Sequence, residues 1–156
     1  METNGELMWL GEPPDREFSP RAAQCIRRFA ETLERGHVVI VDYGYRGRDR
    51  ERFSDGSLMT YSKHQASTDV FADLGERDIT AHVDFDLLAE AGRAAGLTET
   101  VYESQSCYLM RIGEKDEFAG VFAACTNERE LVQARLQLKD LLFGIGETMR
   151  VLEMVK

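Results

Sequence analysis

Apolar residues between Ser19 and Gly36 recur at the spacing of one face of an α-helix. Ser19 is a suitable N-cap, Pro20 fits the first helical position, and Gly36 stands just past the last apolar position. The apolar face consists of Ala22, Ile26, Phe29, Ala30 and Leu33. The pattern predicts a helix that begins at Pro20 and ends before Gly36.

The next stretch, "HVVIVDYGY" at 37–45, changes from helical spacing to an unbroken apolar run. A run without polar alternation is typical of a strand that is covered on both faces. We therefore expect a parallel, interior strand. Strand alternation places Val38, Ile40 and Asp42 on one face, and Val39, Val41 and Tyr43 on the other.

The remaining pattern alternates between strands and helices. "ELMWL" at 6–10 is a short strand candidate, and residues 44–75 are rich in Gly, Ser and charged residues, which predicts a long loop or insertion. "DFDLLAEAGRAAG" predicts a helix with Asp84 as N-cap and Gly96 as its stop. "TETVYES" predicts a strand, "QSCYLMRIG" a strand or a short helix, "NERELVQARLQLKDLLFG" a helix, and "TMRVLEMVK" a last strand.

This order places the chain in the α/β class, with helices packed on a mostly parallel sheet. The 156 residues, 43% of them hydrophobic, can bury one core, so we expect a single domain over residues 1–156.

Charge and cysteine content restrict the possible partners and compartment. The formal net charge is -9, from 19 basic and 28 acidic residues, which argues against nucleic acid binding. Cys25, Cys107 and Cys125 are widely spaced and form no C-x-x-C pair, which favours a reducing compartment. The first twenty residues lack a cationic start with an apolar run, and no apolar segment reaches about 18 residues. We expect a cytoplasmic protein without a membrane span.

Asp42 is a candidate for chemistry because it stands at the carboxyl end of an apolar strand, where open α/β sheets place their ligands. The alternative is a solvated carboxylate or a cap for the following turn. Tyr43 and Tyr45, on either side of Gly44, are candidates for lining a pocket there, or for simple packing.

A second cluster lies in "ERDITAHVDF", in front of the helix over 84–96. Imidazole and carboxylate groups are common metal ligands, so His64, His82, Asp78 and Asp84 are candidate ligands of a metal site. Asp84 already has a structural role as N-cap, and His82 and Asp84 lack the spacing of a helical ligand pair. We therefore expect no metal. The chain also contains neither G-x-G-x-x-G nor G-x-x-x-x-G-K-[ST], so it shows no nucleotide-binding loop of its own.

Five segments in succession, "HVVIVDYGY", "GSLMTYSKH", "DITAHVDFDLLAEAGRAAGL", "SQSCYLMRIG" and "GIGETMRVLEMVK", resemble the carboxyl-terminal half of the MidA family of class I S-adenosylmethionine-dependent methyltransferases. The resemblance runs from about Phe18 to the last residue. It implies part of a Rossmann-like methyltransferase sheet with an antiparallel last strand, and places residues 44–75 in a substrate-side loop or insertion. Family members bind the methyl donor with a glycine-rich loop and an acidic residue upstream of these segments, so we expect donor binding by this chain alone to be weak or absent.

The resemblance also suggests a reaction, because mitochondrial members of the family methylate an arginine of a respiratory complex I subunit during assembly. The resemblance implies a protein substrate, for which a subunit of a respiratory complex is one candidate. It also implies S-adenosylmethionine as the cofactor. The candidates to hold a guanidinium and orient it are Asp42, Asp78 and His82, with Tyr43, Tyr45 and His64 in contact with the substrate. A non-catalytic interaction or assembly module derived from the same fold is the alternative, and a metal-dependent hydrolase is a third hypothesis.

Finally, the resemblance predicts an unpaired edge on the strand over 37–45, because its neighbour in the family's sheet lies upstream. Such an edge favours self-association, aggregation or recruitment of "ELMWL" as a substitute strand.

Overall fold

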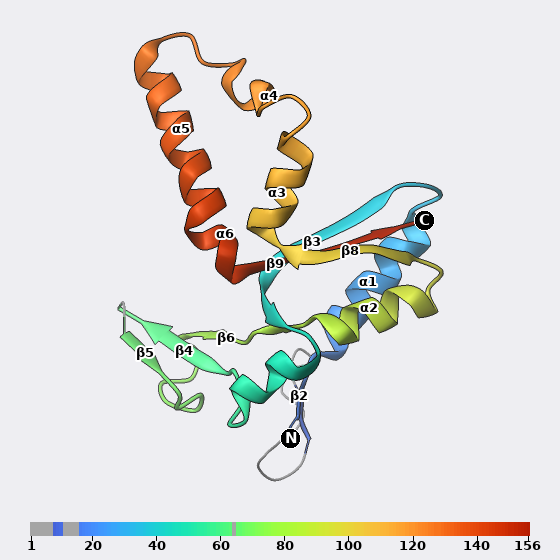
Figure 1. The fold of residues 1–156 in the computed structure, drawn as a ribbon. Helices are drawn as coiled ribbons and strands as arrows, with labels where there is room; N and C mark the ends of the chain where they lie inside the picture. The colour runs from blue at the N-terminus through green and yellow to red at the C-terminus, as the bar shows by residue number, and fades with distance from the viewer. Residues whose placement is uncertain (1–7, 11–15, 64) are drawn as a thin grey trace. The chain divides into compact units, whose positions relative to one another are not determined.

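A computed structural model describes residues 8–10, 16–63 and 65–156 (Figure 1). The described chain forms two compact units. Unit 1 contains the residues up to Arg35, residues 44–98 and Lys156, and unit 2 contains residues 36–43 and 99–155. Of the described residues, none belongs to a helix long and apolar enough to cross a membrane.

Unit 1 begins with two short antiparallel strands, β1 (Met8–Leu10) and β2 (Arg16–Phe18). The strand predicted in "ELMWL" is therefore found for its last three residues, while Glu6 and Leu7 lie outside the described residues. The partner of β1 is β2, so these three residues are not a substitute neighbour for the strand over 37–45. That part of the expectation is wrong.

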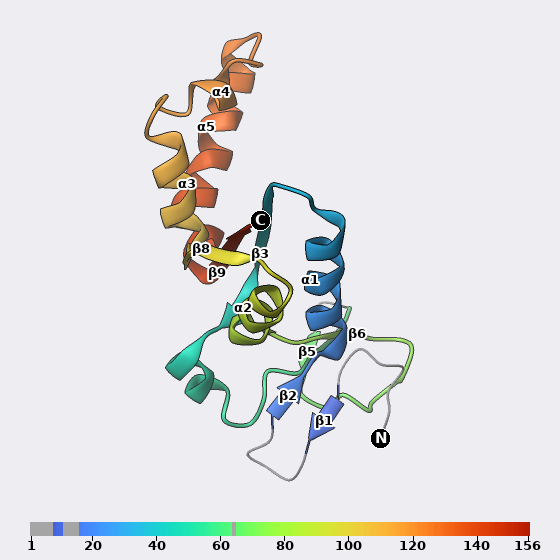
Figure 2. The ribbon, with the colours of Figure 1, turned by 90° about the vertical axis from the view of Figure 1, so that its right-hand side faces the viewer.

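The helix predicted after Ser19 is confirmed as α1 (Pro20–Thr32). The Ser19 hydroxyl accepts a hydrogen bond from the Ala22 amide at 3.4 Å, and Ala23, Ile26 and Ala30 are buried. Helix α2 (Phe85–Ala94) lies beside α1, as Figure 2 shows. It begins at the predicted N-cap Asp84, and Gly96 follows its end in the left-handed conformation. Phe85, Leu88 and Ala89 from α2 complete the buried apolar layer of unit 1.

The segment predicted as a long loop contains regular structure. It begins with the 3₁₀ helix η1 (Gly47–Phe53) and continues into strands β4 (Met59–Ser62) and β5 (Gln65–Ser67). Strand β6 (Asp78–Thr80) completes an antiparallel sheet in the order β5-β4-β6. The strands are only three or four residues long, and most of their residues face solvent, so they carry little of the hydrophobic pattern by which strands are recognised.

Strand β3 (His37–Tyr45) passes from unit 2 into unit 1. Its first seven residues pair antiparallel with β9 (Met149–Val155), which confirms the antiparallel last strand. Only its last two residues pair in parallel, with β7 (Val83–Asp84). The prediction of a parallel interior strand is therefore wrong over residues 37–43, where the partner is antiparallel and Val39 and Val41 are 46% and 43% exposed. An apolar run predicts that a strand is covered, but the direction of its partner depends on contacts far along the chain.

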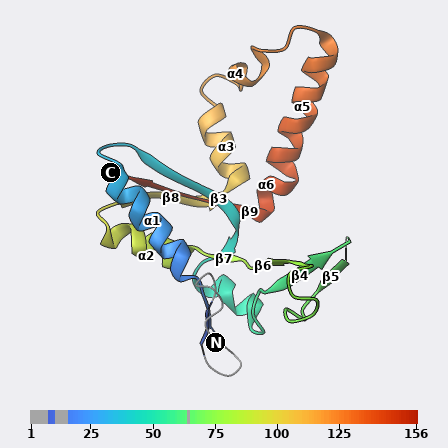
Figure 3. The same cartoon turned by 180° about the vertical axis from the view of Figure 1, so that it is seen from behind.

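In unit 2, β9 lies between β3 and β8 (Thr98–Ser104). Between β8 and β9 the chain forms a helical hairpin, drawn in yellow to red in Figure 3. It consists of α3 (Gln105–Gly113), α4 (Ala119–Phe122), α5 (Glu128–Phe143) and α6 (Ile145–Thr148). The ambiguous "QSCYLMRIG" is thus a helix, capped by the Ser104 hydroxyl, which accepts from the Cys107 amide. Gly113 ends α3 where a Cβ atom would lie 2.1 Å from the Phe118 ring, so a larger residue there would require this ring to move.

Candidate functional site

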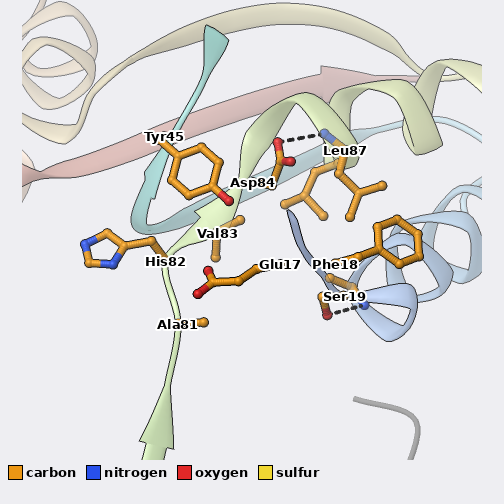
Figure 4. Close-up of a pocket in the computed structure, with 11 residues that line it drawn as sticks. Glu17, Phe18, Ser19, Tyr45, Ala81, His82, Val83, Asp84 and Leu87 are labelled. Carbon is orange, nitrogen blue, oxygen red and sulfur yellow. Dashed lines mark hydrogen bonds between the residues drawn. The ribbon is translucent and has the colours of Figure 1, made fainter. Parts of the chain in front are cut away.

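A pocket of about 160 Å³ lies within unit 1 (Figure 4). Its wall is formed by the end of β2, the first turn of α1, the end of β3, the segment before α2, and α2 itself. The lining residues are Glu17, Phe18, Ser19, Ala22, Tyr45, Ala81, His82, Val83, Asp84, Leu87 and Leu88. Polar groups from separate segments thus converge at one mostly apolar hollow, which is typical of a small binding site.

Glu17 joins two segments that are distant in the sequence. Its carboxylate accepts hydrogen bonds from the Ser57 amide at 2.5 Å, the Ser57 hydroxyl at 2.6 Å and the Leu58 amide at 2.8 Å. The Ser57 hydroxyl in turn accepts from the His82 amide at 2.8 Å, and Ser57 is buried. Because a carboxylate with three donors is strongly held, Glu17 fixes the backbone at Ser57 and, through it, at His82.

Aromatic rings form one side of this region. The Phe53 ring lies 5.5 Å from the Tyr45 ring and 4.5 Å from the His82 ring, measured between centroids. The Arg50 guanidinium lies over the Tyr45 ring at 5.4 Å. Burial, followed by the negative charge of Asp84, raises the pKa of the Tyr45 hydroxyl above its usual value. Tyr45 is therefore a neutral hydrogen-bonding group in this site at physiological pH.

Asp84 and Asp86, at the start of α2, bond both to the first turn of this helix and to the 46–50 segment at the start of η1. One oxygen of Asp84 accepts from the Asp86 and Leu87 amides, at 3.0 and 3.2 Å, while the other pairs with Arg50. Asp86 accepts from the Arg46 guanidinium at 2.9 Å and from the Gly47 amide at 2.8 Å. Both carboxylates are thus engaged by donors of the chain itself.

The structure brings some of the predicted site residues together. Tyr45 and His82 both line the pocket, and Asp78 lies four residues before His82, exposed on β6. Asp42 and Tyr43 belong to unit 2, where an Asp42 oxygen accepts from the Tyr43 amide at 2.7 Å. Both residues lie within β3, so this bond does not cap the turn after the strand, and the role of Asp42 stays a prediction. His64 lies outside the described residues.

The sequence reasoning missed Glu17, Phe53, Ser57 and Arg50. Glu17 stands just before a helix cap and Ser57 within a glycine- and serine-rich stretch, so their local sequence marks them only as turn and helix-start residues. The hydrogen bonds between Glu17 and Ser57 join residues 40 positions apart, and no local sequence pattern predicts such a contact.

Within the described ranges, no three His, Cys, Asp or Glu side chains gather as a metal-binding group requires. In the turn after β3, the Gly47 amide donates to Asp86, so this backbone donor is already engaged within the chain. The pocket lining includes the carboxylates Glu17 and Asp84 but no glycine, whereas the family's donor site combines an acidic residue with a glycine-rich loop. The pocket therefore matches only part of that pattern, and weak or absent donor binding by this chain alone stays a prediction.

Comparison with solved structures finds two crystal structures of COG1565 superfamily proteins from Burkholderia thailandensis. Each matches with a TM-score of 0.74 and 28% sequence identity, covering 90% and 94% of this chain and 38% of theirs. The second was determined with bound S-adenosyl-homocysteine. The similarity confirms the expected fold, a mixed α/β arrangement that matches part of a methyltransferase.

Among curated proteins, the chain is similar to the mitochondrial protein arginine methyltransferase NDUFAF7 of Xenopus laevis. The two are 33% identical over 106 residues, which cover 65% of this chain and 22% of the relative. The chain therefore spans well under half the length of the proteins it matches. A family model described as "Putative S-adenosyl-L-methionine-dependent methyltransferase" matches residues 5–103, more than half of the chain. The chain belongs to this family of S-adenosyl-L-methionine-dependent methyltransferases.

Proposed function

We propose that this chain forms the acceptor side of a protein arginine methyltransferase, with the methyl donor held by residues outside these 156. When bound, S-adenosylmethionine supplies the methyl group. The pocket residues of unit 1 would receive and orient the acceptor side chain.

The observation that carries the proposal is the way in which this site already holds a guanidinium. Arg50 lies over the Tyr45 ring and pairs with Asp84, and both of these residues line the pocket. A carboxylate beside an aromatic face is the chemistry that recognises arginine, through charge-assisted hydrogen bonds and through stacking. The similarity to a protein arginine methyltransferase supports the same acceptor.

Within this proposal, His82 and Asp78 keep the substrate-side roles that the sequence suggests. His82 lines the pocket, its ring is held against Phe53, and its amide is fixed through Ser57 to Glu17. This support restricts the movement of the imidazole, as positioning of an acceptor requires. Asp78, exposed on β6, would attract the basic segment that carries the arginine.

The test uses a chimaera in which this chain replaces the matching part of the Burkholderia protein that binds S-adenosyl-homocysteine. The chimaera is incubated with S-adenosylmethionine that carries tritium in its methyl group and with a protein extract of the organism that encodes this chain. The labelled amino acid is then identified after acid hydrolysis of the proteins. We expect labelled methylarginine. His82→Ala should reduce the label, whereas Gln65→Ala, an exposed change on β5, should not. A chimaera that binds S-adenosyl-homocysteine but labels a residue other than arginine, or none, would refute the proposed acceptor.

A further inference from the structure

The two carboxylates that line the pocket of unit 1 are already engaged by donors of the chain. Both Glu17 oxygens accept hydrogen bonds from Ser57, and one of them also accepts from the Leu58 amide. Asp84 divides its oxygens between two partners, because Oδ1 accepts from the first-turn amides of α2 and Oδ2 pairs with Arg50. A guanidinium that enters the pocket therefore meets carboxylate oxygens that already have partners among the described residues.

Arg50 differs from the other described donors in how readily it can leave. The amides that bond to Glu17 and Asp84 belong to the backbone, and the Ser57 hydroxyl is buried. The Arg50 side chain is long and 41% exposed, and it comes from η1, in which no residue is buried. A partly exposed ion pair of this kind contributes little to stability. Of these bonds, the one from Arg50 costs least to exchange for a bond from another guanidinium.

Helix η1 is attached at both ends by contacts that do not involve Arg50. At its start, the Gly47 amide donates to Asp86 at 2.8 Å. At its end, the Phe53 ring lies 4.5 Å from the His82 ring. Release of Arg50 therefore requires only a change in its side-chain rotamers, which is a fast and local motion, while η1 stays in place.

We propose that Arg50 is an internal occupant of the acceptor subsite, and that the arginine of the substrate displaces it from Asp84 and from the Tyr45 ring. The inference rests on the proposed function, because it takes the acceptor to be a guanidinium. Arg50 presents the same planar group to the same two partners, so it competes with the acceptor for Asp84 Oδ2. Only molecules from which Arg50 has been released can bind an acceptor there, which raises the apparent dissociation constant.

Titration of the 156-residue chain with N-acetyl-arginine amide tests the inference, followed by nuclear magnetic resonance of isotope-labelled arginine side chains. As the ligand saturates the site, the Arg50 Nε–H signal should move towards the position of the signal from Arg48, which is exposed on the same helix. Arg50→Ala should lower the dissociation constant about two- to fivefold, as expected when a partly exposed ion pair no longer competes.

Two variants and a second ligand are the controls. Arg48→Ala removes the same charge from η1 and should leave the dissociation constant unchanged, which separates displacement from a general attraction of cations to a more acidic chain. Arg50→Lys keeps the charge but loses the planar fork, so its constant should fall between those of the wild type and Arg50→Ala. N-acetyl-lysine amide should bind less tightly than the arginine ligand to every variant, for the same reason. Circular dichroism should show the wild-type helix content in each protein.

Equal or weaker binding to Arg50→Ala would overturn the inference, since Arg50 would then support the subsite instead of filling it. An Arg50 signal that does not move at saturation, or the absence of binding to both proteins, would overturn it as well. The labelling experiment with the chimaera judges the proposed function separately. Displacement of Arg50 by the ligand together with label on another residue would refute only the proposed function, whereas labelled methylarginine without tighter binding to Arg50→Ala would refute only the inference.

Discussion

Replacement of Asp84 should separate two contributions to the stability of unit 1. In Asp84→Ala, the Asp86 and Leu87 amides lose their acceptor and Arg50 loses its partner. Loss of an N-cap costs about 1 kcal/mol. The Arg50 side chain is 41% exposed, so the ion pair adds at most about 1 kcal/mol. We expect the free energy of unfolding to fall by about 1.5 to 2 kcal/mol.

Asp84→Asn is the matched control, because asparagine is an equally good N-cap but has no charge for Arg50. It should cost only the ion-pair share, about 0.5 to 1 kcal/mol. Arg50→Ala should cost a similar amount, and the double variant Asp84→Asn/Arg50→Ala should cost less than the sum of the two. Urea unfolding followed by circular dichroism measures all four proteins. If Asp84→Asn destabilised the chain as much as Asp84→Ala, the capping role would be refuted.

Three further predictions concern single residues. Gly44→Ala should destabilise the chain by about 2 to 3 kcal/mol, because a Cβ atom there would meet the backbone carbonyl oxygen of Val83 at 2.3 Å and the Phe85 ring at 2.6 Å; a urea midpoint equal to the wild type would contradict this. Because the folded-state pKa of Tyr45 is raised, its contribution to stability is present below the usual value of 10.0 and is lost as the pH rises above it. Tyr45→Phe should therefore flatten the fall of the urea midpoint above pH 10.0, and an unchanged slope would count against it. The pKa of Glu130 is lowered by hydrogen bonds, first from the Thr126 amide, so its contribution is present above 4.5 and is lost as the pH falls through the folded-state value. Glu130→Gln should make the melting temperature less sensitive to acid, and an equal acid sensitivity in both proteins would show that these bonds do not stabilise the fold.

The elements that the sequence predicts well are those with local signals at their ends. Ser19 and Asp84 cap the helices that their positions predict, because an N-cap acts within three residues of itself. The helix over 128–143 has a similar local start, the Asn127 side chain, which accepts from the Glu130 amide. The last strand is also found as predicted, pairing antiparallel with β3.

The features that could not be predicted depend on contacts between distant segments. The antiparallel direction of the β3 partner depends on pairing with a distant segment, and the apolar run of β3 itself suggested a parallel neighbour. The small sheet β5-β4-β6 also depends on pairing between segments, and its short strands have hardly any hydrophobic pattern. The same holds for the site. The positions of Tyr45 and His82 in the sequence make them candidates for the site. Glu17 is recognised only in the structure, where its carboxylate accepts a hydrogen bond from the Ser57 hydroxyl. Asp42, Tyr43, Asp78 and His64 keep their proposed substrate roles as predictions, as do the cytoplasmic location, the respiratory partner and the association through the β3 edge.

Calorimetric titration of S-adenosylmethionine tests the central claim most directly, because that claim divides the reaction between this chain and residues beyond it. We predict no saturable binding to the 156-residue chain alone, and one-to-one binding to the chimaera with the Burkholderia protein under the same conditions. Tight one-to-one binding to the chain alone would contradict the account, since the donor site would then lie within these 156 residues.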